Sequence, residues 1–403
     1  MKFKSDVTKK IGWTIFLMFI YVLGSKLTLP FVDVTKTLTL SGFSGGLELT
    51  SAVMGGGLRS MNIFSIGLSP WMSSMLLWRM FTVSKKFNLD NIPFKVLERR
   101  KMYLALVVAI IQSLSTSLYL PLQEGVNSML AIILNTVILI AGAFFLIWLA
   151  DINSMMGLGS STAIMIIGMI LYMPSDIDRS FTTLSLGYEW LLVIFAYALF
   201  VLYVAIIFER SIYQVPISKI GIHNDFKKYS YLDIKLNPAG GMPIMYALSL
   251  VSIPQYILML IVAFKPNLVK INDWISSFQM GKPVWLITYV IVIFILGIGF
   301  AFVNVNGDEI SDKMQKNAEY IEGIYPGNPT RKYINSIVRK LGVVGALYLV
   351  VFSVAPMLIV LKDIRYLRLS MIPGIFMIFI GMVFMIKEEV KALRLNEKYT
   401  QIF

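Results

Sequence analysis

Long apolar runs alternate with shorter polar segments along almost the whole chain. A helix needs about 20 residues to cross a hydrocarbon core of about 30 Å, and most of ten runs approach that length, although the fifth is short. The only Asp, Glu, Lys or Arg inside them is Lys26, near the end of the first run, where a long side chain can reach the interface. The pattern predicts ten transmembrane helices, at Ile11–Leu29, Met61–Trp78, Met102–Leu120, Met129–Ala150, Ser161–Met173, Trp190–Phe208, Met242–Phe264, Val284–Val303, Leu341–Leu361 and Met371–Ile386.

Composition supports an all-α polytopic membrane protein. Hydrophobic residues make up 57% of the chain and charged residues only 15%, whereas a soluble domain carries about a quarter charged residues. The absence of cysteine excludes disulfides, and we expect the first apolar run to be a retained span rather than a cleaved signal peptide. The net charge of +13 indicates membrane topology rather than nucleic-acid binding, because the basic residues lie between apolar runs.

The distribution of basic residues predicts the orientation. With both termini in the cytoplasm, most of the 36 Lys and Arg residues lie on the inner side of the membrane. Two outer loops run against this bias, and their basic residues are Lys265, Lys270 and Lys282 in one loop and Lys362, Arg365 and Arg368 in the other. Orientation follows the whole distribution, so we expect a multi-pass protein of the plasma membrane with cytoplasmic termini.

Five spans followed by five spans permit two inverted halves, because an odd-numbered repeat inserts in opposite orientations. We divide the chain into residues 1–208, a cytosolic loop at 209–241, and residues 242–403 with a second cytosolic loop at about 304–340. The two loops are mixed in charge. They are either ordinary solvated loops or a docking surface for a cytosolic partner.

A short segment precedes the second span. Residues Gly46–Met54 could form a helix of roughly 14 Å, at ~1.5 Å per residue, which is under half the bilayer. Gly55, Gly56 and Gly57 follow it and permit a sharp bend. Non-helical backbone at membrane depth survives only inside protein or beside a water-filled cavity. The segment is therefore either a re-entrant piece, at about residues 41–60, or an external loop.

Three motifs resemble those of the SecY family of protein-conducting channels. Residues 55–74 read GGGLRSMNIFSIGLSPWMSS and resemble the family's plug hinge and second helix. Residues 235–247 read KLNPAGGMPIMYA and look like the start of its seventh helix. Residues 323–335 read GIYPGNPTRKYIN and resemble its connection between helices eight and nine. The three motifs occur in the right order, and with the ten spans they cover nearly the whole chain.

The differences between this sequence and the family motifs point to one branch of the family. Tyr325 stands where the family has arginine, the plug segment is more polar and glycine-rich, and several pore positions are methionine. These features are similar to the accessory SecY proteins of Gram-positive bacteria, which export serine-rich glycoprotein adhesins with their own SecA. The resemblance implies a translocating polypeptide, membrane lipid, an accessory SecA-type motor ATPase, and small SecE-like membrane subunits or accessory Sec proteins as partners, without nucleic acid.

The resemblance also implies an hourglass of two five-helix halves with a plug on the outer side. Methionine would suit an apolar ring, because its flexible side chain can deform around varied cargo. Most methionines in such a protein simply fill packing gaps, so the alignment selects the candidates. The ring would comprise Leu68, Met72, Ile166, Met245 and Met377, and the plug with its hinge Leu47, Met54, Gly55, Gly56 and Gly57.

A lateral gate would lie between the second and seventh helices. Pro70, Pro243 and Pro254 would kink these helices, and polar residues would line them, although small residues also serve ordinary helix packing. The gate candidates are Ser73, Ser74, Ser249, Ser252 and Ile253. The motor-docking candidates are Lys227, Lys228, Tyr325, Pro326 and Gly327.

Two other classes of function remain as alternatives. An ion- or solute-coupled secondary transporter usually places ionisable residues at the bilayer midplane, and the ten spans contain none there. A non-transport membrane scaffold is the second alternative. We expect no enzyme activity and no cofactor, because the chain has no P-loop and a single histidine, His223, in a loop. Energy would then come from a partner ATPase.

Overall fold

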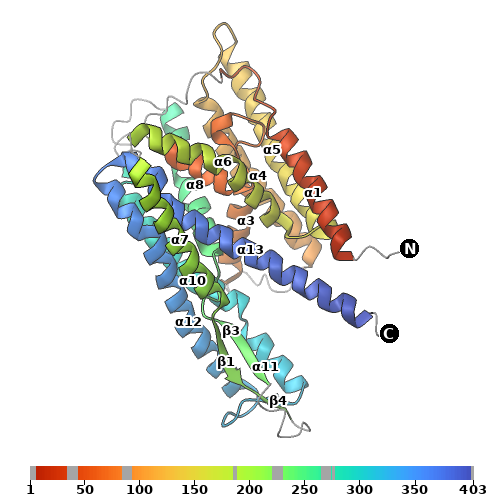
Figure 1. Ribbon diagram of the computed structural model, residues 1–403. Coiled ribbons are helices and arrows are strands. Elements are labelled where there is room, and N and C mark those ends of the chain that lie inside the picture. Colours follow the sequence, from red (N-terminus) through yellow and green to blue (C-terminus); the bar gives the residue numbers. More distant parts are fainter. Residues whose placement is uncertain are drawn as a thin grey trace.

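The computed structural model describes residues 6–33, 44–83, 93–184, 188–219, 230–264, 274 and 277–400. Within these residues, ten helices overlap the ten predicted spans, and they form one bundle (Figure 1). They are α1 Asp6–Gly24, α3 Ser69–Val83, α4 Phe94–Leu118, α5 Ser128–Met156, α6 Ser160–Leu184, α7 Tyr188–Arg210, α8 Met242–Phe264, α10 Pro283–Asn304, α12 Asn328–Val354 and α13 Leu367–Thr400. In the described part of the chain, seven helical segments are long and apolar enough to cross a membrane, and Ser160–Tyr172 is a shorter apolar helix.

The helices pack as expected for a protein solvated by lipid. Aliphatic and aromatic residues from α1, α3, α5, α6, α8, α10, α12 and α13 form one large buried cluster. Large apolar side chains nevertheless stay exposed on the outside, including Phe19 on α1 and Trp148 on α5. In water such a surface would be costly, whereas lipid tails solvate it.

Several predicted boundaries differ from the helices of the structure, and two of the differences concern the second and fifth spans. The second span was predicted from Met61, but α3 begins at Ser69, and residues 61–68 form irregular turns. The Asn62 side chain stabilises these turns by accepting a hydrogen bond from the Phe64 amide at 3.0 Å. The fifth span was predicted to end at Met173, but α6 continues through Pro174 to Leu184. Hydropathy detects burial of apolar residues, not the backbone conformation that buries them.

The two long polar loops fold together at one end of the bundle (Figure 1). Strand β1 Ile212–Pro216 pairs antiparallel with β3 Tyr231–Lys235. Strand β2 Ser218–Lys219 pairs with β4 Glu319–Tyr320, which joins the first loop to the second. Helix α11 Gly307–Lys316 lies between α10 and β4. These strands were not predicted from the sequence. We call the body formed by β1–β4, α11 and the first turns of α12 the platform.

The platform has a hydrophobic core of its own. Val215 and Ile234 of the hairpin are buried with Met314 of α11, Ile321 beyond β4 and Ile334 of α12. These residues come from two loops that are far apart in the sequence. The loops are therefore one packed body and not two independent solvated connections.

A few short elements complete the described fold. Helix α2 Ser44–Val53 and the 3-10 turn η1 Leu58–Ser60 precede α3, and the 3-10 segments η5 Ala355–Leu361 and η6 Ile364–Tyr366 connect α12 to α13.

Candidate functional site

The five predicted ring residues lie in or against the large hydrophobic cluster of the bundle. Four of them, Leu68, Met72, Met245 and Met377, are at most 4% exposed and belong to this cluster, which we call the central cluster. The half-buried Ile166 packs against it. They come from the start of α3, from α8, from α13 and from α6. Many other residues belong to this cluster, so burial alone does not distinguish the five side chains as a ring.

Helix α2 packs inside the bundle. Leu49, Val53 and Met54 belong to the central cluster, while Leu47 packs on Tyr256 and Met259 near the end of α8. The Leu68 amide donates a hydrogen bond to the Met54 carbonyl at 2.8 Å, which ties the segment directly to the start of α3. Of the two interpretations of this segment, its burial favours a packed re-entrant piece over an external loop.

The glycines after α2 are required mainly by close packing. Gly55 has a φ of +72° and its carbonyl accepts a hydrogen bond from the Tyr21 hydroxyl at 2.7 Å. A Cβ on Gly56 would lie 2.8 Å from the Gly67 amide nitrogen, and a Cβ on Gly67 would lie 2.6 Å from the Met54 carbonyl oxygen. A Cβ on Gly57 would meet the Tyr172 ring. Glycine is therefore required here for close packing, and the hinge role of these residues stays a prediction.

A line of side-chain hydroxyls joins α3 to α8. The Ser73 and Ser249 hydroxyl oxygens are 2.6 Å apart, and Ser69 lies 3.3 Å from Ser249. Gln112 of α4 donates to the Ser69 hydroxyl at 3.1 Å. We call Ser69, Ser73, Ser249 and Gln112 the polar seam.

The other gate candidates do not bond across the seam. Ser74 donates to the Trp71 carbonyl and Ser252 to the Ser249 carbonyl, both within their own helices. Ile253 is half-buried on α8, one turn beyond Ser249. Of the five gate candidates, the structure thus brings Ser73 of α3 together with Ser249 of α8.

A cavity of about 430 Å³ lies where the bundle meets the platform, and we call it the vestibule. One wall is apolar and rich in methionine, and it includes Met245 from the predicted ring. The other wall is polar and comes from α7, β3, α10 and α13. The lining includes Met242, Met245, Ile378, Met382 and Met385 on the apolar side, and Glu209, Asp233, Lys235, Asn304 and Glu388 on the polar side.

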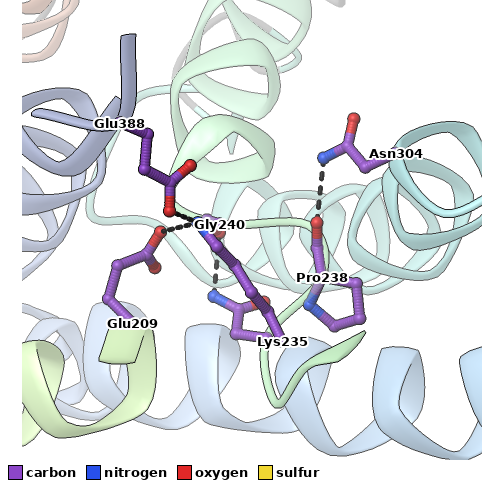
Figure 2. Close-up of polar contacts among 7 residues, drawn as sticks. Glu209, Lys235, Pro238, Gly240, Asn304 and Glu388 are labelled. Carbon is purple, nitrogen blue, oxygen red and sulfur yellow. Dashed lines mark hydrogen bonds and ion pairs between the residues drawn. The ribbon is translucent and has the colours of Figure 1, made fainter. Parts of the chain in front are cut away.

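Lys235 connects three elements at the polar wall (Figure 2). Its ammonium nitrogen lies 2.7 Å from a carboxylate oxygen of Glu388 on α13 and 3.7 Å from one of Glu209 on α7. Asn304 of α10 donates to the Pro238 carbonyl at 2.9 Å. The motif that begins at Lys235 is therefore the turn into α8, fastened to α7, α10 and α13.

Glycine again allows close approach in this turn. Gly240 has a φ of +64°, and a Cβ on Gly241 would lie 2.8 Å from the Met377 carbonyl of α13. Asn237 donates to the Gly240 carbonyl at 3.0 Å. The start of α8 thus lies directly against α13, next to the central cluster.

The third motif forms an exposed turn on the platform. Thr330 donates to the Tyr325 carbonyl at 2.9 Å, and Ser311 donates to the Gly327 carbonyl at 3.0 Å. The turn holds Tyr325 outward with 82% of its surface exposed, and Pro326 beside it is also exposed. The remaining docking candidates, Lys227 and Lys228, lie outside the described residues.

Charges around this turn are locally paired. Arg331 forms an ion pair with Asp308 across the turn. On α11 the Lys313 ammonium hydrogen-bonds Glu309 and lowers the pKa of that carboxyl, because it favours the charged form. In the described part of the chain, no group of three or more His, Cys, Asp or Glu residues is placed to hold a metal ion.

Several polar residues of the site were not predicted. Gln112, Glu209, Asn304 and Glu388 act only through partners that are distant in the sequence, so no local pattern signals them. Another ion pair, between Glu48 of α2 and Arg368 of α13, was also missed. Its one sequence signal is that Arg368 lies in a predicted outer loop whose basic residues run against the charge bias.

Comparisons with known proteins agree with this architecture. The family described as SecY matches residues 62–387. The accessory Sec system protein translocase subunit SecY2 of Streptococcus sanguinis is 56% identical over 402 residues, covering 99% of both chains. The SecY2 protein of Streptococcus gordonii is 54% identical, covering 100% of this chain and 99% of that one.

A solved structure described as that of a protein-conducting channel has a TM-score of 0.73 with 12% identity, and the match covers 98% of this chain and 95% of that one. At 12% identity this likeness shows only a shared fold. The family match and the two Streptococcus relatives show that the sequence is related as well. The chain therefore belongs to the SecY family of protein-translocation channels, in its accessory Sec branch.

Proposed function

We propose that unfolded polypeptides enter at the vestibule, pass the central cluster beside Met245, and displace α2 to leave on the other side. The vestibule supports this path because it reaches Met245 from the platform end, while α2 packs against the same cluster. The closed state then has two barriers. The first is a narrow apolar neck, which excludes water and ions, and the second is α2 as a physical stopper.

The platform would face the cytoplasm of a bacterial cell. The basic residues favour this orientation, because most of them lie on the side that also carries both termini. The membrane would then be the plasma membrane, and exported chains would enter from the platform end.

The polar seam is the observation that carries the opening mechanism. Hydrogen bonds between hydroxyl groups contribute only about 0.5–1.5 kcal/mol each, and interhelical bonds within membranes average about 0.6 kcal/mol. A seam made of a few such bonds separates at low cost, unlike interdigitated apolar packing. We therefore infer that α3 and α8 part at Ser73 and Ser249 when a polypeptide enters.

A disulfide across the seam is expected to abolish translocation. The chain has no native cysteine, so Ser73→Cys with Ser249→Cys introduces a single pair. A disulfide requires Cα atoms within about 7 Å, which the contact between the two hydroxyls favours. Oxidation should crosslink most of the protein and stop export in vesicles, and reductant should restore it.

The control pair is Ser73→Cys with Ile253→Cys, one turn further along α8, which should crosslink less efficiently. Full export through an oxidised, crosslinked Ser73–Ser249 channel would contradict a path that needs α3 and α8 to separate. Equal crosslinking of both pairs would show that the helices do not hold the register described above.

The platform would dock a cytosolic motor ATPase of the SecA type. Exposed aromatic side chains on a rigid turn are typical of residues that dominate binding energy at interfaces, and Tyr325 is such a residue. The accessory Sec name of the relatives is consistent with an accessory motor, with small SecE-like subunits, and with serine-rich glycoprotein adhesins as cargo. We include these partners in the proposal.

Tyr325→Ala combined with Lys227→Ala and Lys228→Ala should weaken motor binding by roughly tenfold or more, because loss of one aromatic anchor typically costs about 2 kcal/mol. Export should fall in parallel, while the protein remains inserted. Binding of the purified motor to proteoliposomes measures the effect. Tyr103→Ala is the matched control, since Tyr103 is exposed on α4, away from the platform. Normal export by the triple variant would count against this docking surface.

A further inference from the structure

Glu48 is the only charged residue in the sequence of α2, SGGLELTSAV, and its side chain is 8% exposed. A carboxylate buried this far is costly unless a cation compensates it. Arg368, at the start of α13, donates a hydrogen bond from its guanidinium to the Glu48 carboxylate at 2.9 Å. Its side chain is 22% exposed, so the pair is largely shielded from water.

This pair explains one of the outer basic residues that run against the charge bias. Arg365 in the same loop pairs with Asp363, which is its neighbour in the sequence, and lowers the pKa of that carboxyl by hydrogen-bonding its charged form. Arg368 instead reaches a residue 320 positions away. A cation at this position therefore has a specific partner on α2.

We propose that Glu48 and Arg368 form a latch that holds α2 in its closed position, and that this contact breaks when α2 is displaced. The inference rests on the proposed role of α2 as a stopper. An apolar side chain at position 48 would also favour the closed position, but it would be exposed to water once α2 moved out. A carboxylate and a guanidinium are both well solvated after separation, so the pair does not penalise the displaced state, while in the closed position each charge compensates the other.

The latch also explains why closure is specific in position. Apolar packing of α2 against the central cluster tolerates small shifts of the helix. A hydrogen-bonded ion pair does not, because its hydrogen bond needs a short distance and good alignment and is lost when one partner is displaced. The pair thus selects one seating of α2 against α13.

Channel conductance in planar bilayers without substrate tests the latch. Glu48→Gln and Arg368→Gln should each raise the open probability about tenfold or more, because each leaves one charge buried without this partner. The double variant Glu48→Arg with Arg368→Glu should return it to within about twofold of the original protein. Arg365→Gln is the control and should leave the open probability unchanged, since Arg365 pairs with Asp363 in its own loop.

Three outcomes separate the latch from the stopper. If deletion of residues 47–54 opens the channel but the single Gln variants stay silent, the latch is wrong and the stopper stands. A leak in the charge-swapped variant as large as in the single variants also overturns the latch. If the deletion itself is silent, the stopper role of α2 is wrong.

A cysteine pair covers the case in which a Gln variant fails to insert. Glu48→Cys with Arg368→Cys, joined by a cleavable thiol-reactive crosslinker that spans the original ion pair, should be silent when joined and should leak when the crosslinker is cleaved. Failure of this crosslinker to join the two cysteines would contradict the contact between α2 and α13. Leakage by the crosslinked protein would contradict the latch.

Discussion

Aspartate at both Met72 and Met245 is expected to give a channel that conducts ions continuously without a polypeptide. Both side chains are almost completely buried in the central cluster, on α3 and α8. An ionised carboxylate in such a place has a large desolvation cost unless water enters. Water that enters to solvate two carboxylates would connect the vestibule with the seat of α2, and a wet neck passes ions.

Single-channel recording in planar bilayers, without motor or substrate, measures this effect. Deleting Leu47–Met54 from the double variant should increase the leak further, because it removes the second barrier. Met72→Leu with Met245→Leu is the matched control and should remain silent, since it preserves an apolar neck of similar volume. Silent bilayers from the double aspartate variant, with insertion confirmed, would remove these two residues from the proposed path.

The helical spans could be predicted because lipid solvation imposes a simple rule on sequence. Every backbone polar group in the hydrocarbon must be satisfied, so long apolar runs become helices. The rule fails where protein, rather than lipid, surrounds the chain. Residues 61–68 are apolar enough to extend a span, yet they form turns, because the Asn62 side chain and the backbone of Leu27, Leu29 and Met54 satisfy their polar groups.

The polar contacts could not be predicted in the same way. Lys235 lies within a recognised motif, but its partners Glu209 and Glu388 are brought to it only by the packing of α7 and α13. The platform strands were missed for a related reason. β2 and β4 are two residues each and pair across a long sequence separation, so neither shows a periodic pattern of its own.

The glycines at 55–57 show how one residue type supports two interpretations. From the sequence alone, three consecutive glycines predict conformational freedom, and a flexible tether for a stopper follows naturally. Only Gly55 of the three has a positive φ in the structure. Gly56 lacks room for a Cβ because the backbone of Gly67 lies against it. In this structure the glycines therefore provide room for close packing, and their role as a flexible tether stays a prediction.

Gly67→Ala is expected to dislodge the base of α2 and to destabilise the protein. Gly67 has a φ of +66°, which costs a non-glycine residue on the order of 1 kcal/mol or more. Its new Cβ would lie 2.6 Å from the Met54 carbonyl and 2.7 Å from the Gly56 amide nitrogen. Both are backbone atoms, so the clash cannot be relieved by a side-chain rotation. Overpacking of this kind costs about 1–3 kcal/mol in addition.

The clash lies next to the hydrogen bond from the Leu68 amide to the Met54 carbonyl, so α2 should shift from its seat and ions should leak. Thermal unfolding in detergent and bilayer conductance measure the two effects. Gly125→Ala is the control for backbone strain alone, because Gly125 has a φ of +90° but nothing within 4 Å of its Cβ position. Gly299 on α10 has neither a positive φ nor an atom within 4 Å of its Cβ position, so Gly299→Ala should match the original protein in stability and in conductance. If Gly67→Ala loses no more stability than Gly125→Ala and does not leak, then the contact between Gly56 and Gly67 does not hold α2 in place.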